Sequence, residues 1–301
     1  MKILILGNSS IFQRKALPSL KKIRKINIEI ASKRNINFNH NYKTYKSYAT
    51  AINKSKAKVV YISLINSEHF KWALYCLKKN KHVLIDKPIT TNHIDTLKLI
   101  STASKKKLFL SEVIFFHKHR QFEHLIKYLN FKKPIKLNSK FHIPKLSKKN
   151  FRNYKKFGGG CFQDMSTYAA YLFYLFFKND NFQILKLNNK KKFANFNLVA
   201  KHKNILIRSS FKFNSSYKNE MTIDNAKYRY KVNFIFAPPI DNNTNIRILD
   251  KNINKNYIIT LKKQNAFDKY FSYIFNLIKK KKYNYYYNEI KKISEIRQQI
   301  S

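Results

Sequence analysis

Glycine is scarce in this chain: its 301 residues include only four, Gly7 and the run Gly158, Gly159 and Gly160. Glycine is needed where the backbone takes a positive φ or passes very close to another group. In a chain so poor in glycine, these positions mark the places where backbone geometry tolerates the least change. We expect both to be turns with a specific structural or functional requirement.

Cysteine is almost absent too, since only Cys76 and Cys161 occur, far apart and without a CxxC motif or a neighbouring histidine pattern. This excludes a disulfide framework and a zinc site. No set of His, Asp and Glu has metal-ligand spacing, so we expect no metal. Both cysteines are predicted to be small buried apolar residues.

Long apolar runs are missing as well. The longest, such as residues 59–64 and 172–177, are far too short to cross a bilayer. The N-terminus has Lys2 and then a short apolar segment, without the longer apolar stretch and cleavage site of a secretory signal. We therefore expect a cytoplasmic protein with no membrane partner.

Acidic residues are few: 15 Asp and Glu stand against 62 Lys and Arg, which gives a formal net charge of +47. Such a charge favours nucleic acid as a partner. However, the basic residues are spread over the whole chain, and Asn, Ile, Phe and Tyr are abundant too. A genomic bias toward A- and T-rich codons explains all of these together, so we predict no specific nucleic-acid partner. A nucleic-acid-associated protein remains an alternative that rests on charge alone.

The first part of the chain alternates short apolar strands with helices. Predicted strands are Lys2–Leu6, Ile26–Ala31, Ala57–Leu64, His82–Ile85 and Leu108–Glu112. Helical spacing lies between them, which is typical of a parallel sheet covered on both faces. The pattern predicts an α/β Rossmann domain over residues 1–118.

The remainder has a different pattern. Helices are predicted at Phe122–Leu129, Asp164–Phe177, Ala266–Ile278 and Tyr287–Ile300, and period-two strands dominate residues 182–261. We therefore predict an α+β domain over residues 119–301 with a large, mainly antiparallel sheet, directly joined to the first domain.

The turn after the first strand has the geometry of a dinucleotide site, in which a helix N-terminus meets a pyrophosphate. Of the three glycines of G-x-G-x-x-G only Gly7 is present; the second and third positions are Ser9 and Phe12. An ordinary strand-to-helix turn is the alternative. We assign Gly7, Ser9, Ser10 and Ile11 to cofactor binding, and note that Phe12 could crowd a pyrophosphate.

The end of the second strand bears on cofactor choice. NAD-preferring sites place a carboxylate there for the ribose hydroxyls, whereas this chain has Ser32, Lys33 and Arg34. A hydroxyl and two cations favour a 2′-phosphate, so we predict binding of NADP(H) in preference to NAD(H). A solvated basic turn is the alternative.

The segment Val60–Pro88 carries a resemblance to a known family. Its end, Val83-Leu84-Ile85-Asp86-Lys87-Pro88, resembles the "EKP" element of the glucose–fructose oxidoreductase and inositol dehydrogenase (Gfo/Idh/MocA) family. Asn66 and His69 in the preceding loop follow the same pattern. Glu112 and His119 resemble the later strand end and turn, and Gly158–Tyr168 resembles the glycine run followed by Asp and then His or Tyr. The resemblance covers most of the chain.

The resemblance implies site residues, and their positions make physical sense. Lys87 lies at the carboxyl end of a parallel strand, where α/β sheets bind ligands, before a proline that the family implies is cis. Asp164 and Tyr168 are four apart, on one face of a helix. We predict that Lys87, Asp164 and Tyr168 are catalytic and that these three, with Arg152, bind substrate. The alternatives are a surface lysine, a core tyrosine and a solvated arginine.

The resemblance also adds Asn66, His69, Asp86 and Lys87 to the predicted cofactor site. It implies an NAD(P)-dependent dehydrogenase or reductase that acts on a carbohydrate-like alcohol or ketone, including nucleotide-linked keto-sugars. The substrate is then a small sugar-like molecule, and a homodimer or homotetramer is expected. The alternative is a degenerate, non-catalytic member that acts as a binding or scaffold protein.

Overall fold

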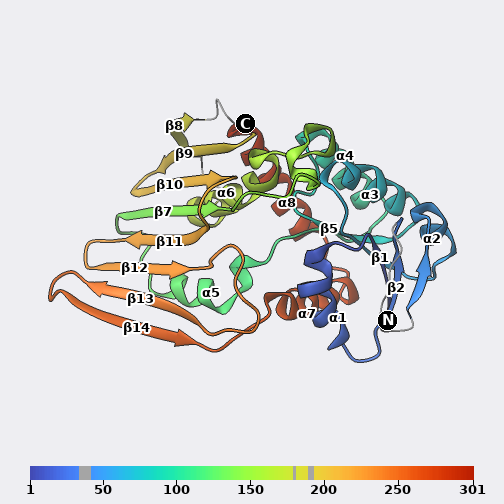
Figure 1. The fold of residues 1–301 in the computed structure, drawn as a ribbon, viewed down its shortest axis with the longest axis horizontal. Coiled ribbons are helices and arrows are strands. Elements are labelled where there is room, and N and C mark those ends of the chain that lie inside the picture. The colour runs from blue at the N-terminus through green and yellow to red at the C-terminus, as the bar shows by residue number, and fades with distance from the viewer. Residues whose placement is uncertain (34–41, 179–180, 189–192) are drawn as a thin grey trace. The chain divides into compact units, whose positions relative to one another are not determined.

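The computed structural model describes residues 1–33, 42–178, 181–188 and 193–301 (Figure 1). The chain divides into two compact units. The first comprises Met1–Ile114, Lys156–Gly158 and Tyr270–Ser294, and the second comprises Phe115–Lys155, Gly159–Lys269 and Glu295–Ser301. The sequence-based boundary between residues 118 and 119 stays a prediction about the folding domains.

The first unit is built on a six-stranded parallel sheet in the order β3-β2-β1-β4-β5-β6. Its strands are β1 (Lys2–Leu6), β2 (Asn27–Ala31), β3 (Lys43–Tyr45), β4 (Val59–Ile62), β5 (His82–Asp86) and β6 (Leu110–Val113). The chain order reverses between β1 and β4, where open α/β sheets bind ligands at the carboxyl ends of their strands. The predicted Rossmann fold is confirmed.

Helices cover both faces of this sheet. Leu4, Val60 and Ile85 on one face pack in a buried cluster with α2 (Tyr48–Lys54), α3 (His69–Lys78), α4 (His93–Lys105) and the first part of α8 (Asn284–Gln299). On the other face, Tyr61 contacts Phe12 of η1 (Phe12–Ala16) and Phe271 of α7 (Ala266–Lys279). α1 (Leu17–Lys21) continues η1, so the central strands of the sheet are buried, whereas the edge strand β3 is exposed.

The second unit has an eight-stranded sheet in the order β14-β13-β12-β11-β7-β10-β9-β8. Its strands are β7 (Ile135–His142), β8 (Gln183–Asn188), β9 (Asn195–His202), β10 (Ile205–Lys212), β11 (Lys218–Asp224), β12 (Tyr228–Asn233), β13 (Thr244–Asp250) and β14 (Lys255–Leu261). Every neighbouring pair is antiparallel except β7 and β10. The predicted mainly antiparallel sheet is confirmed.

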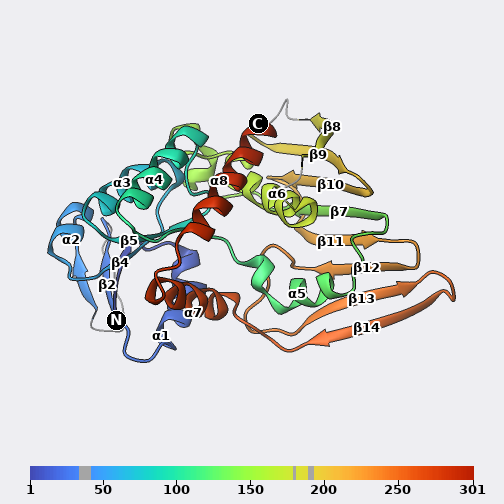
Figure 2. The ribbon, with the colours of Figure 1, turned by 180° about the vertical axis from the view of Figure 1, so that it is seen from behind.

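One face of this sheet is covered by α5 (Arg120–Lys127) and α6 (Cys161–Phe177), as Figure 2 shows. α6 is almost wholly buried, because apolar residues occur on nearly every side of it. The strands beneath it alternate buried and exposed side chains, with Ile207 and Phe211 of β10 facing inward. α6 is therefore held rigidly, which fixes any functional side chain that it carries.

Lysine and asparagine occupy positions where helices ordinarily end in glycine. Asn80, Lys107, Lys178 and Lys281 follow or cap α3, α4, α6 and α7 with φ between 52° and 56°. In all, nine of the described non-glycine residues have a positive φ. This left-handed conformation costs about 1–2 kcal/mol for a residue with a Cβ. The chain thus forms normal helix ends without the residue that suits them best.

Two smaller expectations can also be compared with the structure. Cys76 and Cys161 are free and buried, as predicted. Among the described residues, no helix is both long enough and apolar enough to span a membrane.

Candidate functional site

The carboxyl ends of the parallel strands bring most of the predicted cofactor residues to one edge of the first unit. Gly7 and Ser9 follow β1, Ser32 follows β2, and Asn66 follows β4. Lys87 follows β5 directly. The residues therefore gather where the strand order reverses, although they are distant in sequence.

The loop after β1 needs its glycine. Gly7 has φ +96°, and a Cβ there would lie 2.2 Å from the carbonyl oxygen of Ser63. Its N–H donates to Ala31 O at 2.8 Å, which ties the loop to the end of β2. Any larger residue would push β1 away from β4, so the fingerprint's first glycine has a physical reason to be present.

Phe12 does not extend into the loop. Its side chain is fully buried and packs edge-on against Tyr61, with ring centroids 6.1 Å apart. It begins a π-helical turn, wider than an α-helical one, where the fingerprint has its third glycine. Phe12 therefore does not crowd the site of the pyrophosphate, and it gives no support to the alternative of a non-catalytic protein with a blocked cofactor site.

A chain of hydroxyl groups connects this loop to β5. Ser9 Oγ lies 2.7 Å from Ser63 Oγ, and Ser63 Oγ donates to Asp86 Oδ2 at 2.5 Å. Tyr61 donates to the other carboxylate oxygen, also at 2.5 Å. Burial raises the pKa of Asp86, while these two hydrogen bonds oppose the rise. Sequence reasoning missed Ser63 and Tyr61, whose partner lies more than twenty residues away along the chain.

Among the described residues at the end of β2, none places a carboxylate that faces outward. Glu29 lies inside the strand, where its carboxylate accepts a hydrogen bond from Tyr45 at 2.9 Å. Ser32 donates its backbone N–H to Tyr45 O, and the Lys33 ammonium lies 5.6 Å from the ring centroid of Tyr48. Arg34 lies outside the described residues. A hydroxyl and a cation thus occupy the position where NAD-specific sites have an acid.

The turn after β5 has the cis Lys87–Pro88 peptide bond that the family resemblance implies. His69, fully buried at the start of α3, braces this turn: Nδ1 lies 2.7 Å from Pro88 O and Nε2 lies 3.1 Å from Leu64 O. Burial lowers the pKa of His69. Because its ring contacts two backbone carbonyls, His69 holds the turn after β5 in place at the edge of the sheet where the predicted cofactor residues gather.

Asn66 and Glu112 also bind backbone at this edge. The Asn66 amide donates to Gly158 O at 2.8 Å, and the Glu112 carboxylate accepts from Ile89 N–H at 2.8 Å. A Cβ on Gly158 would lie 2.8 Å from Asn66 Cβ. Gly158 is therefore required because its backbone passes very close to the Asn66 side chain.

In the second unit, the rest of the glycine run precedes α6 and shapes a tight loop. A Cβ on Gly159 would lie 2.6 Å from the carbonyl oxygens of Phe151 and Arg152, and 2.7 Å from that of Tyr154. This loop brings Arg152 to α6, where its Nε lies 2.9 Å from Asp164 Oδ1. The Asp164 side chain is 7% exposed, so the ion pair holds a nearly buried carboxylate.

Tyr168, one turn further along α6, is packed by aromatic rings. Its ring centroid lies 5.2 Å from that of Phe236, 5.3 Å from Phe141 and 6.0 Å from Phe116. Asp164 and Tyr168 lie on one α6 face, as their spacing predicts. His119 has a structural task instead, because its Nδ1 caps α5 by accepting from Gln121 N–H.

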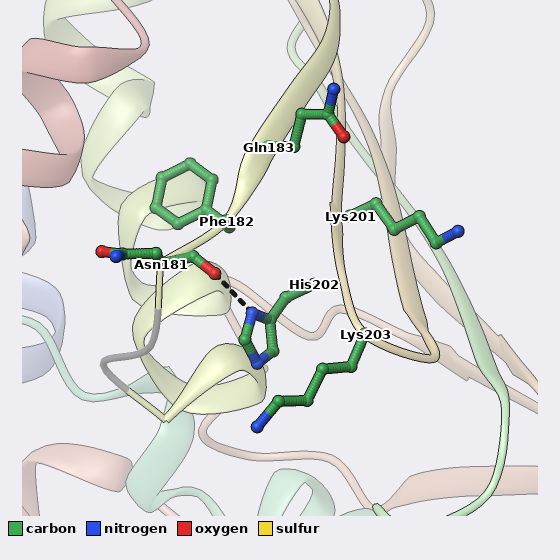
Figure 3. A pocket seen from close by; sticks show the side chains of 6 residues that line it. All are labelled: Asn181, Phe182, Gln183, Lys201, His202 and Lys203. Carbon is green, nitrogen blue, oxygen red and sulfur yellow. Dashed lines mark hydrogen bonds between the residues drawn. The ribbon is translucent and has the colours of Figure 1, made fainter.

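The hollow in Figure 3 lies elsewhere, beside β8 and β9 of the second unit. Its volume is about 480 Å³, and it is lined by Asn181, Phe182, Gln183, Lys201, His202 and Lys203. His202 contacts the backbone oxygen of Asn181 there. No predicted site residue lines it. Among the described residues, no cluster of three or more His, Cys, Asp or Glu is placed to hold a metal.

Comparison with known proteins agrees with this geometry. Residues 1–113 match the GFO_IDH_MocA model, described as an oxidoreductase family with an NAD-binding Rossmann fold. The match covers strands β1 to β6 of the first unit, the part of the chain that carries the Rossmann fold. This confirms the family resemblance carried by the segment that ends at Lys87 and Pro88.

Two similar proteins are dTDP-3,4-didehydro-2,6-dideoxy-alpha-D-glucose 3-reductases. The one from Saccharopolyspora spinosa is 30% identical over 126 residues, which are 41% of this chain and 38% of that protein. The match thus spans well under half of the relative. The one from Actinomadura kijaniata is 24% identical over 253 residues, 79% of this chain and 76% of that protein.

A solved structure of a 3-ketoreductase from Actinomadura kijaniata, in complex with NADP and TDP-benzene, has the same fold. Its TM-score is 0.88 at 19% identity, and the match covers 98% of this chain and 95% of that one. At this identity the match establishes the architecture of both units, and function is argued from the site.

Proposed function

We propose that this chain is an oxidoreductase that binds NADP(H) in preference to NAD(H). It transfers hydride between the nicotinamide and a carbohydrate-like alcohol or ketone, with nucleotide-linked keto-sugars as the substrate class. The observation that carries the proposal is Lys87, which follows β5 beside the reversal of strand order and precedes a cis proline. The reductase names of the relatives support the substrate class.

The residues at the sheet edge fit a dinucleotide. Ser9 satisfies the N–H groups of Phe12 and Gln13, which leaves those of Ser10 and Ile11 in the first helical turn without an acceptor among the described residues. Such N–H groups bind a pyrophosphate. Ser32 and Lys33, with Arg34, are proposed to bind the 2′-phosphate, because no carboxylate is present there to repel it.

Three side chains are proposed to perform the chemistry. When bound, NADPH supplies a hydride to the carbonyl carbon of the substrate. The Lys87 ammonium stabilises the negative charge that develops on the carbonyl oxygen. Tyr168 donates a proton to that oxygen, so that one hydride and one proton convert the ketone into an alcohol. Asp164, paired with Arg152, orients the substrate, and Arg152 binds its polar groups.

Assembly is part of the proposal. We propose a homodimer or homotetramer formed through the sheet of the second unit. Its outer strands expose apolar side chains, among them Leu185 at 48% and Ile258 at 62%. We propose no specific nucleic-acid partner, because the basic residues are spread over the whole chain. Light scattering after size-exclusion chromatography measures the oligomeric state directly.

The first experiment is a fluorescence titration with NADPH and with NADH in about 1 M salt. At that concentration the Debye length is about 3 Å, so general attraction between the basic chain and any polyphosphate is screened. We expect saturable binding with NADPH clearly preferred. Lys33→Ala should reduce the preference, whereas Lys255→Ala, which removes an equal charge from β14, should leave it unchanged.

Two outcomes decide the matter. If neither nucleotide binds, the enzyme proposal is wrong. If NADPH binds, turnover is measured with dTDP-linked keto-sugars and with free keto-sugars; a strong preference for the free sugars would exclude the nucleotide-linked class while leaving the reaction type intact.

A further inference from the structure

The hydroxyl chain from Ser9 to Asp86 has a fixed direction. An ionised carboxylate only accepts hydrogen bonds, and a serine hydroxyl has one hydrogen to donate. Ser63 donates its hydrogen to Asp86 at 2.5 Å. In the 2.7 Å contact between the two serines, Ser9 must therefore be the donor.

This direction determines what Ser9 can do. Because its hydrogen is directed to Ser63, its oxygen is presented as an acceptor, and Phe12 N–H donates to it at 3.1 Å. Ser9 thus caps the first helical turn in the manner of an N-cap serine. Its hydroxyl hydrogen cannot also serve a phosphate, so phosphate binding is left to backbone N–H groups.

We propose that Asp86 and Ser63 are positioning residues for the dinucleotide loop. Asp86 orients the Ser63 hydroxyl, Ser63 orients that of Ser9, and Ser9 holds the first turn with the N–H groups of Ser10 and Ile11 directed at the pyrophosphate. Ser63 is 2% exposed, so it is proposed to act on the loop through Ser9. The inference rests on the proposed function, because the loop is positioned for a bound dinucleotide.

The test compares two buried serines of the same sheet. Ser63→Ala cuts the chain, whereas Ser111→Ala removes a fully buried hydroxyl on β6 that hydrogen-bonds to Tyr270 at 2.8 Å and to Glu112 O at 3.1 Å, and not to Ser9 or Asp86 among the described contacts. We expect Ser63→Ala to raise the Kd of NADPH about 3- to 10-fold, the loss of one hydrogen bond. Ser111→Ala should leave that Kd within about twofold.

A second probe separates positioning from general damage. Adenosine 2′-monophosphate has the 2′-phosphate but no pyrophosphate, so its Kd should be the same for Ser63→Ala and for the unaltered protein. Equal weakening of both ligands by Ser63→Ala would overturn the proposal, since it would indicate a general loss of structure.

The link to Asp86 is tested by a double-mutant cycle. Asp86→Ala alone should raise the Kd of NADPH. In the Ser63→Ala background it should raise this Kd little further, because the row of hydrogen bonds from Asp86 to Ser9 is already interrupted. Additive effects would overturn the proposal. Absence of NADPH binding in the unaltered protein would instead refute the proposed function, so the two failures are distinguishable.

Discussion

Tyr168 of the second unit is held in the opposite way to the candidate residues at the sheet edge of the first unit. At the sheet edge of the first unit, Ser9, Asp86 and His69 are fixed by hydrogen bonds, each with a required donor and acceptor. In the second unit, Tyr168 is fixed by three phenylalanine rings, whose contacts depend on shape. The first arrangement should therefore be sensitive to substitutions that keep the volume but remove a polar atom. The second should be sensitive to changes in volume.

The largest effect, a loss of kcat, is expected when Tyr168 loses only its hydroxyl group. Tyr168→Phe keeps the ring and its three contacts, so the free energy of unfolding should fall by no more than the contribution of one hydrogen bond, about 1 kcal/mol. If Tyr168 is the proton donor, kcat should fall about 10²- to 10⁴-fold while NADPH still binds. Tyr171→Phe on the same helix is the matched control and should retain kcat within about twofold. An unchanged kcat in Tyr168→Phe would assign the tyrosine to the core alone.

A change in volume should act strongly in the second unit. Gly159→Ala places a Cβ 2.6 Å from two carbonyl oxygens, and backbone atoms cannot move aside cheaply. We expect a loss of about 1–3 kcal/mol in the free energy of unfolding, measured by urea titration. Lys155→Ala in the same loop, an exposed position, should cost less than about 0.5 kcal/mol. Equal costs for the two variants would show that the loop is not tightly packed.

Acid should destabilise the second unit through its buried histidines. Burial lowers the pKa of His117 to about 3 and that of His142 to about 4, from an ordinary value of 6.5. The unfolded chain therefore binds protons first, and stability present above pH 6.5 is lost as the pH falls toward these values. Each histidine contributes a slope of up to about 1.4 kcal/mol per pH unit.

His117→Phe tests this assignment. The ring of His117 stacks on Tyr171 at 5.4 Å, so a phenyl ring preserves the contact but does not titrate. Urea midpoints measured at pH 7 and pH 5 should differ less for the variant than for the unaltered chain. An identical pH dependence would mean that other groups cause the acid sensitivity.

The smallest effect is expected for the ion pair on α6. Arg152 is 30% exposed, and partly exposed pairs contribute little to stability, so Arg152→Gln should cost no more than about 1 kcal/mol of unfolding free energy. If Arg152 binds substrate, KM should rise with little change in NADPH affinity. A large loss of stability would show that the nearly buried Asp164 carboxylate depends on this cation more than the exposure of Arg152 indicates.

Apolar patterning was enough to predict both sheets. The buried strands β1, β4 and β5 read as short continuous apolar runs, and β10 alternates, so their burial is visible in the sequence. β3 was missed, because its residues Lys43–Tyr45 form a polar edge strand. The membership of Tyr270–Ser294 in the first unit was not predictable either, since it depends on contacts between distant segments.

Site residues were predicted where a strand end or a motif marks them, as for Gly7 and Lys87. The connections between them were not. The contact of Ser9 with Ser63 joins residues 54 apart, and nothing local distinguishes Ser63 from any other serine. The glycine run was predicted to be a turn with a structural or functional requirement, and Gly158 and Gly159 are required by neighbouring protein atoms. Sequence shows that space is needed, but not which atoms occupy it.

The left-handed lysines and asparagines at the helix ends make this chain an easy one to stabilise. At Asn80, Lys107 and Lys281 a glycine would relieve backbone strain and lose an exposed side chain, which at Asn80 includes an exposed hydrogen bond from Lys106 at 2.7 Å. Each replacement should raise the free energy of unfolding by a fraction of a kcal/mol, and the effects of replacements at distant sites should be additive. These helix ends are therefore sites of backbone strain that single substitutions can relieve. A thermostable version could be reached by introducing glycines there, with the candidate site residues unaltered.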